Sequence, residues 1–270
     1  MKKVITLIMF SIAILQTYGQ SAEKYFQIGL SKSEKGDYIG AIDDFSKAIE
    51  LDPKNAGAYY NIGIAKNKLK DFIGAIADYS KTIELNPKYT DAYVKRANTW
   101  YNLKDYIGAI ADYSKAIELE PKNADAYSNR GTAKAFLKDY RGAIADYSKA
   151  IELDPKDAAL AYYRRGNAKD NLEDYIGAIA DYSKAIELDP KNTDAYHNRG
   201  TAKDNLKDYR GAIADYSKAI ELDPKNADAY YSRGKARYSL EYKNGACLDW
   251  TKAGELGNAD AFDLIKKYCN

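Results

Sequence analysis

The sequence predicts an all-α protein made of stacked helical hairpins, and three recurring features support that fold class. The first is a proline spacing of 34, 34, 34, 35 and 34 residues. The six prolines are Pro53, Pro87, Pro121, Pro155, Pro190 and Pro224. The second feature is apolar residues at steps of three and four, and the third is an aspartate ahead of each such stretch. A period of this size indicates units that bury their apolar faces by stacking on one another.

The amino terminus has the charged, apolar and small-residue regions of a secretory signal. Two lysines are followed by an apolar run over residues 4–15 and by the small residues Thr17 and Gly19. The run is short for a membrane span. We therefore expect a signal peptide over residues 1–19, cleaved ahead of Gln20, and an exported protein that is periplasmic or secreted. An uncleaved anchor is the alternative.

The charges of the chain are nearly balanced, with 41 Lys and Arg against 39 Asp and Glu. Nucleic-acid binding requires a basic face, whereas here lysines alternate with acids, so no nucleic-acid partner is expected. The chain also has 26 tyrosines against 6 phenylalanines. Tyrosine combines an apolar ring with a hydroxyl that needs a partner, which suits half-buried surfaces.

The second half of each repeat has the spacing of an amphipathic helix. Ala109, Tyr113 and Ala116 are spaced by three or four residues and so lie on one stripe. Asp105 is a favourable cap at the start of this helix. Pro121 ends the helix, because proline cannot continue the hydrogen-bond ladder.

The first half of each repeat reads as a second helix that packs against its partner. Tyr127, Gly131 and Lys134 are spaced for one face. Gly131 has no side chain, so a neighbouring helix can approach its backbone closely. Each repeat is therefore expected to be a helical hairpin.

The text around each proline recurs almost unchanged, as in residues 105–121 and 174–190. An aromatic residue stands at position four, Gly or Ala at eight, Ala at twenty, an aromatic residue at twenty-four and Pro at thirty-two. This pattern resembles the tetratricopeptide repeat. The resemblance implies a right-handed α-solenoid of seven units. In the family's frame the units are 22–55, 56–89, 90–123, 124–157, 159–192, 193–226 and 227–258, with Ala158 as an extra residue.

The carboxyl terminus departs from the repeat. No proline follows the last second helix, and residues 259–270 are expected to form a helix that caps the open end of the stack. Cys247 and Cys269 are the only cysteines. An even count in an exported protein favours a disulfide, which would hold this helix to the last unit. The alternative is one buried small residue and one free thiol.

Catalytic and metal-site patterns are missing from the sequence. His197 is the only histidine, and no paired cysteine spacing or nucleophile motif accompanies it, so neither enzymatic activity nor a metal or other cofactor is expected. A recurring glycine, such as Gly108 or Gly142, lies inside helices rather than in a phosphate-binding loop. We expect these glycines to allow close packing.

An arginine stands at position seven of five units, and an aspartate stands at position twenty-three of the same units. The arginines are Arg96, Arg130, Arg165, Arg199 and Arg233. The aspartates are Asp112, Asp146, Asp181, Asp215 and Asp249. Arg forms bidentate pairs with carboxylates, so we expect a structural ladder of ion pairs inside the hairpins. A stripe that binds anions is the alternative.

The resemblance also implies a binding groove, because in this family the first helices line the concave side. Positions two, five, nine and twelve usually point into it. The candidate groove residues are Tyr60, Asn98, Tyr101, Tyr163, Asn167, Asp170, His197, Asp204, Tyr231, Lys235 and Tyr238. Some of these tyrosines could instead fill gaps between helices. Val94 and Tyr163 occupy position five where some members grip a terminal carboxylate with lysine, so such recognition is not expected.

The sequence therefore predicts a scaffold that binds a protein or peptide partner, in assembly or regulation of the cell envelope. Self-association of near-identical units into a homo-oligomer is a second hypothesis. A third is carbohydrate binding or processing by the tyrosines. The paired carboxylates in a cleft that glycoside hydrolysis needs are not evident.

Overall fold

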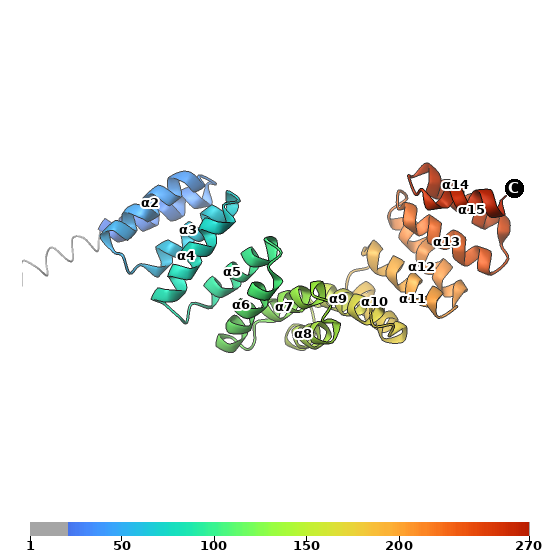
Figure 1. The fold of residues 1–270 in the computed structure, drawn as a ribbon, viewed down its shortest axis with the longest axis horizontal. Coiled ribbons are helices and arrows are strands. Elements are labelled where there is room, and N and C mark those ends of the chain that lie inside the picture. The colour runs from blue at the N-terminus through green and yellow to red at the C-terminus, as the bar shows by residue number, and fades with distance from the viewer. Residues whose placement is uncertain (1–20, 270) are drawn as a thin grey trace, which may run out of the picture. The chain divides into compact units, whose positions relative to one another are not determined.

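The structure, a computed structural model, describes residues 21–269, which are all-α (Figure 1). Helices alternate with short turns, and this range has no strand. The predicted fold class is confirmed. The predicted signal peptide over residues 1–19 lies outside the described residues. Across the described part, none of the helices has the length and apolar character to span a membrane.

The chain divides into two compact units, Met1–Ala126 and Tyr127–Asn270. The first begins with a helix over residues 21–34. It continues with α2 (Tyr38–Leu51), α3 (Ala56–Lys68), α4 (Phe72–Leu85), α5 (Thr90–Asn102) and α6 (Tyr106–Leu119). The helix α7 (Ala124–Phe136) starts in the last residues of the first unit and lies mainly in the second unit. There follow α8 (Tyr140–Leu153), α9 (Ala159–Asp170), α10 (Tyr175–Leu188), α11 (Thr193–Asn205), α12 (Tyr209–Leu222), α13 (Ala227–Ser239), α14 (Lys243–Glu255) and α15 (Asp260–Tyr268).

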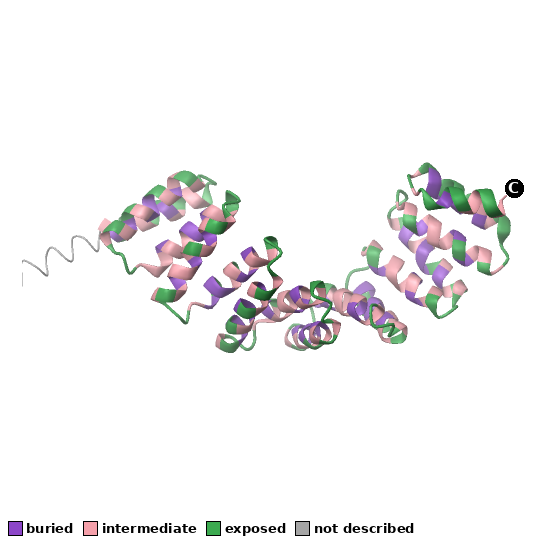
Figure 2. Ribbon diagram, viewed as in Figure 1, coloured by how far each residue is buried: buried purple, intermediate pink, exposed green. Residues whose placement is uncertain are grey.

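The helices pack in pairs. In the first unit α3 packs on α4 and α5 on α6, and in the second unit α9 packs on α10, α11 on α12 and α13 on α14. Within each unit, second helices also contact the first helix of the next hairpin, as α4 does with α5 and α10 with α11. Figure 2 shows buried residues along the helices and exposed residues at the turns.

A buried aromatic ring lies against a glycine in most hairpins. A Cβ atom added at Gly63 would lie 2.6 Å from the ring of Tyr79, and one added at Gly166 would lie 2.7 Å from that of Tyr182. Real Cβ atoms do not approach this closely, so a larger residue would displace the ring. The fully buried aromatic residues at position twenty-four are Phe45, Tyr79, Tyr113, Tyr147, Tyr182, Tyr216 and Trp250.

An aspartate caps the second helix of the first six hairpins. The Asp105 carboxylate, for example, accepts a hydrogen bond from the Gly108 N–H at 2.9 Å. The cap residues are Asp37, Asp71, Asp105, Asp139, Asp174 and Asp208. The glycine that donates is close to this carboxylate, since a Cβ at Gly142 would lie 2.1 Å from Oδ2 of Asp139. The predicted close packing at this position is thus largely packing on the cap itself.

The turn between the two helices of a hairpin contains a residue with positive φ. In the first hairpin this residue is Gly36, at φ 82°. The equivalent residues in the other hairpins have φ between 62° and 65° and carry side chains. They are Lys70, Lys104, Lys138, Glu173, Lys207 and Glu241.

The carboxyl-terminal helix α15 lies on α14. Trp250 is buried together with Ala261 of α15, and the rings of Tyr238 and Tyr268 pack around it with centroids 4.5 Å apart. A disulfide joins Cys247 of α14 to Cys269, just beyond α15. The apolar end of the last hairpin is therefore covered by a helix that is tied covalently to it.

Candidate functional site

The five arginines at position seven all pair with the aspartates at position twenty-three. In each pair Nε and Nη2 donate to the two carboxylate oxygens, as in Arg165 with Asp181 at 2.8 and 2.6 Å. The other pairs are Arg96 with Asp112, Arg130 with Asp146, Arg199 with Asp215 and Arg233 with Asp249. The aspartates are buried, with 3–6% exposure. A buried charge of this kind requires such a partner.

Each arginine also makes contacts outside its pair. Arg165 donates through Nη1 to the Ser148 hydroxyl of the preceding hairpin at 2.9 Å, and its guanidinium lies 5.3 Å from the ring of Tyr162. A second cation, Lys169, lies 2.8 Å from the same Asp181 carboxylate. The arginines thus join neighbouring hairpins, and the geometry is that of a structural clasp rather than of a free anion site.

In the first unit, three candidate groove residues contact tyrosines. The ring of Tyr60 packs on Tyr79 and Tyr89, at centroid distances of 5.9 and 4.9 Å. Asn98 Oδ1 accepts a hydrogen bond from the hydroxyl of Tyr113. Tyr101 packs edge-on against Tyr106 at 5.4 Å. All three are half-buried.

In the second unit, Tyr163 and Asn167 belong to one hydrogen-bonded network between α9, α10 and α11. Asn167 Oδ1 accepts from the Tyr182 hydroxyl at 2.8 Å and from Asn198 Nδ2 at 3.0 Å. Asn198 Nδ2 also donates to the Tyr163 hydroxyl at 3.2 Å. Tyr163 and Asn167 therefore position neighbouring helices as well as lining the surface.

Asp170, His197 and Asp204 each have a buried polar atom with no hydrogen-bond partner within residues 21–269. The atoms are Oδ1 of both aspartates and Nδ1 of the histidine. Burial raises the pKa of both carboxyls and lowers the pKa of His197, whose ring packs on Tyr216 at 5.3 Å.

Tyr231, Lys235 and Tyr238 lie on α13. The ammonium of Lys235, an exposed residue, is 5.7 Å from the centre of the Tyr231 ring. Tyr238 packs on Trp250 at 5.7 Å and belongs to the terminal cluster with α15. Tyr231 and Lys235 are thus more available to a ligand than Tyr238.

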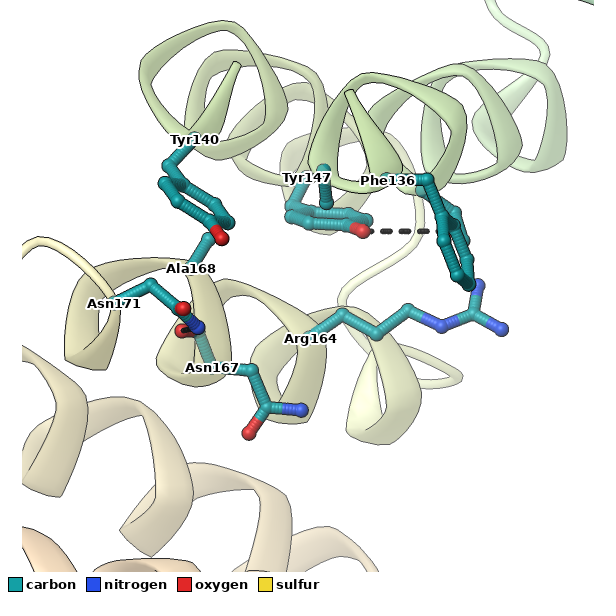
Figure 3. Close-up of a pocket in the computed structure, with 9 residues that line it drawn as sticks. Phe136, Tyr140, Tyr147, Arg164, Asn167, Ala168 and Asn171 are labelled. Carbon is teal, nitrogen blue, oxygen red and sulfur yellow. Dashed lines mark hydrogen bonds between the residues drawn. The ribbon is translucent and has the colours of Figure 1, made fainter. Parts of the chain in front are cut away.

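A cavity of about 290 Å³ opens between α7, α8 and α9 (Figure 3). Arg164 extends from α9 toward the ring of Phe136, which is 56% exposed. The Tyr147 hydroxyl hydrogen-bonds with Thr132 at 3.2 Å. The other lining residues are Ala135, Tyr140, Asn167, Ala168 and Asn171. Aromatic faces, amides and a guanidinium can together hold both the apolar and the polar parts of a peptide.

A second cavity, of about 270 Å³, adjoins the first through Asn167 and Asn171. Asp170, Tyr182, Asn198 and Thr201 complete its lining. The sequence prediction included Asn167 and Asp170 but missed Arg164, Phe136, Asn171 and Asn198. A signal existed for Arg164, because the equivalent residues in neighbouring hairpins are Asn129 and Asn198. The repeat that contains Arg164 therefore has a guanidinium where the neighbouring repeats have an amide.

These features define a helical-hairpin repeat protein whose first helices form polar and aromatic hollows. Family comparisons agree. The TPR repeat model matches residues 29–70, 98–135 and 205–240, and two tetratricopeptide repeat models match 56–89, 124–157 and 159–192, and 182–214. The chain belongs to the tetratricopeptide repeat family. None of the curated proteins matches it.

Several solved structures have the same fold. The crystal structure of MamA is 29% identical, with a TM-score of 0.60, and the match covers 64% of this chain and 94% of that one. YrrB, described as a TPR protein with an unusual peptide-binding site, is 25% identical, with a TM-score of 0.63 and coverage of 70% and 97%. The C-terminal part of a TPR repeat-containing protein from Cytophaga hutchinsonii has a TM-score of 0.72 at 20% identity, covering 88% and 98%.

Proposed function

We propose that this protein is an exported, non-catalytic scaffold of the cell envelope that binds a peptide or protein partner in the concave groove of its first helices. The observation that carries the proposal is the pair of adjoining cavities on α7, α9 and α11, lined by aromatic rings, amides and one arginine. Tetratricopeptide repeat proteins are generally protein-binding scaffolds, and the similar protein YrrB is described as having a peptide-binding site.

Export is the part of the proposal that rests on the sequence alone. The charged, apolar and small-residue regions of residues 1–19 support it. Amino-terminal sequencing of the protein from its native cells tests it directly. A mature chain beginning near Gln20 in the periplasm or medium is expected, whereas an intact Met1 on protein in the cytoplasm would contradict export.

The binding proposal is tested by capture of a partner on immobilised protein of residues 21–270. Envelope proteins of the source organism are passed over it and those retained are identified by mass spectrometry. A variant with Tyr163, Asn167 and Tyr231 changed to Ala should lose the partner. Since Tyr163 and Asn167 also hydrogen-bond with Asn198, a second variant, Arg164→Ala, tests the groove with fewer lost internal contacts.

A matched control is Glu187→Gln, whose side chain is 65% exposed on α10 and pairs with Lys184. The expected result is one discrete partner that the parent protein and this control retain and the groove variants lose. Retention of the same partner by both groove variants would place binding elsewhere.

Self-association is the second candidate function, and one observation favours it. The second helices expose isoleucines at one repeat position, between 67% and 74% accessible. They are Ile39, Ile73, Ile107 and Ile176. Recurrent exposed apolar side chains can mediate contacts between copies. Sedimentation at increasing protein concentration distinguishes the two functions, because only self-association predicts a mass that rises with concentration and falls on Ile107→Lys.

A further inference from the structure

Two aspartates on the first helices of the second unit form no ion pair with any of the residues 21–269. Oδ1 of Asp170 on α9 and Oδ1 of Asp204 on α11 are buried, and neither accepts a hydrogen bond within residues 21–269. By contrast, Asp181 in the same hairpin as Asp170 is held by Arg165 and Lys169 at 2.6 and 2.8 Å. A carboxylate oxygen that accepts no hydrogen bond from the protein is free to accept one from a ligand.

The fold does not require an acid at this position. Asp170 and Asp204 are the twelfth residues of their units. The equivalent residues in the other hairpins are Ser33, Asn67, Tyr101, Ala135 and Tyr238. Small, polar and aromatic side chains are therefore all compatible with the packing there. The two acids occur only in neighbouring hairpins, and Asp170 lines the second cavity.

The cavity next to Asp170 has room for the end of a side chain. Its volume of about 270 Å³ is several times the ~30 Å³ share of one water molecule in the liquid. Asn167, Asn171 and Thr201 also line it, which supplies neutral hydrogen-bond acceptors around the carboxylate. Such a lining suits a group with several N–H donors.

We propose that Asp170 and Asp204 receive lysine or arginine side chains of the bound partner, so that the partner segment is basic. This inference rests on the proposed function, since it names the chemistry of the peptide that the groove would hold. Charge-assisted hydrogen bonds from an ammonium or guanidinium would satisfy the two carboxylates.

The distance between the two helices sets the spacing of the cations. The hydrogen bond between Asn198 and Asn167 shows that α11 and α9 are in contact. Helices in contact lie about 8–10 Å apart, and an extended peptide rises about 3.3 Å per residue, so the two basic residues are about three residues apart.

The surrounding charges give this site a direction. Arg164 lines the neighbouring cavity on the other side of Asn167, and it disfavours a third cation of the partner there. Lys235 of α13 lowers the pKa of Asp204, against the larger effect of burial, whereas no cation acts in this way on Asp170. Asp170 is therefore the stronger anchor of the two.

Fluorescence polarisation with labelled synthetic peptides tests the proposal. Three peptides of one common sequence carry, three residues apart, two arginines, two citrullines or two glutamates. Citrulline keeps the shape of arginine without its charge. The parent protein is compared with Asp170→Asn/Asp204→Asn and with Glu187→Gln/Glu221→Gln, which removes the same charge from exposed side chains of α10 and α12.

We expect the parent protein to bind the arginine peptide at least about tenfold more tightly than the citrulline peptide. The Glu187→Gln/Glu221→Gln protein should show the same preference, and the Asp170→Asn/Asp204→Asn protein should show none. Equal binding of the arginine and citrulline peptides would overturn the cation inference while leaving the groove proposal intact. Loss of the preference in the exposed-glutamate control as well would reduce it to net charge and also overturn it. If no peptide binds although partner capture succeeds, the inference falls and the proposed function stands.

Discussion

The first two hairpins and the last four hold the aspartate at position twenty-three in different ways. In the first two, position seven is isoleucine, and lysines pair with the carboxylate: Lys32 and, at 3.7 Å, Lys47 in the first hairpin, and Lys66 in the second. Lys32 lies 2.5 Å from Asp44, and Lys66 lies 2.7 Å from Asp78. In the last four, an arginine forks over the carboxylate and a second cation joins it, as Arg130 and Lys134 do on Asp146.

The difference shows two solutions to one burial problem. With one cation, burial still raises the pKa of Asp78, although the ammonium of Lys66 opposes the shift. The second hairpin has buried apolar surface at position seven instead, since Ile62 is only 5% exposed, whereas Ile28 of the first hairpin is 37% exposed. The later hairpins use charge instead, and their arginines also reach a serine of the preceding hairpin, as Arg233 does with Ser217. The carboxyl-terminal half of the protein should therefore depend more on its ion pairs.

The largest expected effect tests this dependence directly. Asp181→Asn should lower the free energy of unfolding of its hairpin by about 3 kcal/mol, because Arg165 and Lys169 lose their buried carboxylate. Asp78→Asn should change it by less than about 1 kcal/mol, because burial already disfavours the ionised form. Hydrogen exchange resolved by peptide measures each hairpin separately. Equal losses at the two sites would break the comparison.

The disulfide gives the second largest effect. The bond closes a loop across a sequence separation of 22 residues, so Cys247→Ser/Cys269→Ser should destabilise the last hairpin by about 3 kcal/mol. Exchange protection should fall in α14 and α15 and remain unchanged in α3 and α4. Reductant added to the parent protein should reproduce this pattern, and a uniform loss over the whole chain would contradict a local tie.

A smaller effect of the opposite sign is expected at the unpaired carboxylates. Burial raises the pKa of Asp170 above its ordinary 3.8. The carboxyl group therefore lowers the stability of the folded state as the pH rises from 3.8 through the higher folded-state pKa, and has no such effect below pH 3.8. Asp170→Asn should therefore raise stability at pH 7 by up to about 1 kcal/mol, and have no effect near pH 3. Thermal unfolding at the two pH values measures both. A destabilised variant at pH 7 would show that the carboxylate has an internal partner.

The smallest effect is expected on the exposed faces of the second helices. Lys184 and Glu187 pair at 2.6 Å, with exposures of 55% and 65%. Exposed pairs of this spacing contribute little, so Glu187→Gln should change the unfolding free energy by less than about 0.5 kcal/mol. A much larger change would mean that exposed ion pairs stabilise the hairpins about as much as the buried pairs do.

The fold could be predicted from the sequence because its determinants are local. Asp105 caps a helix by accepting a hydrogen bond from the N–H of Gly108, three residues later, and Pro121 follows the end of the same helix. Position eight must be small because the ring of a residue sixteen positions later lies on it, as Tyr147 does on Gly131. The small residue recurs in all seven repeats and the cap and the proline in the first six, so the interpretation of one repeat applies to the others.

The candidate site could be predicted only in part. The helical frame identifies which face Tyr163, Asn167 and Asp170 share, but whether a hollow forms depends on the sizes of residues from several helices. Ala135 and Ala168 leave the space that Phe136 and Arg164 border, and no single repeat encodes that combination. The frame also cannot tell that Asn167 turns toward Tyr182 and Asn198 rather than only outward.

The hairpin turns carry a penalty that the chain repeats. Six lysine or glutamate residues adopt a left-handed backbone where the first hairpin has Gly36, and this conformation costs a residue with a side chain about 1 kcal/mol. Glycine at Lys104 or Glu173 would relieve one such penalty without touching the groove. Glycine at all six positions should therefore raise the stability of the protein. A longer array built from the same repeat would have one more strained turn for each repeat added.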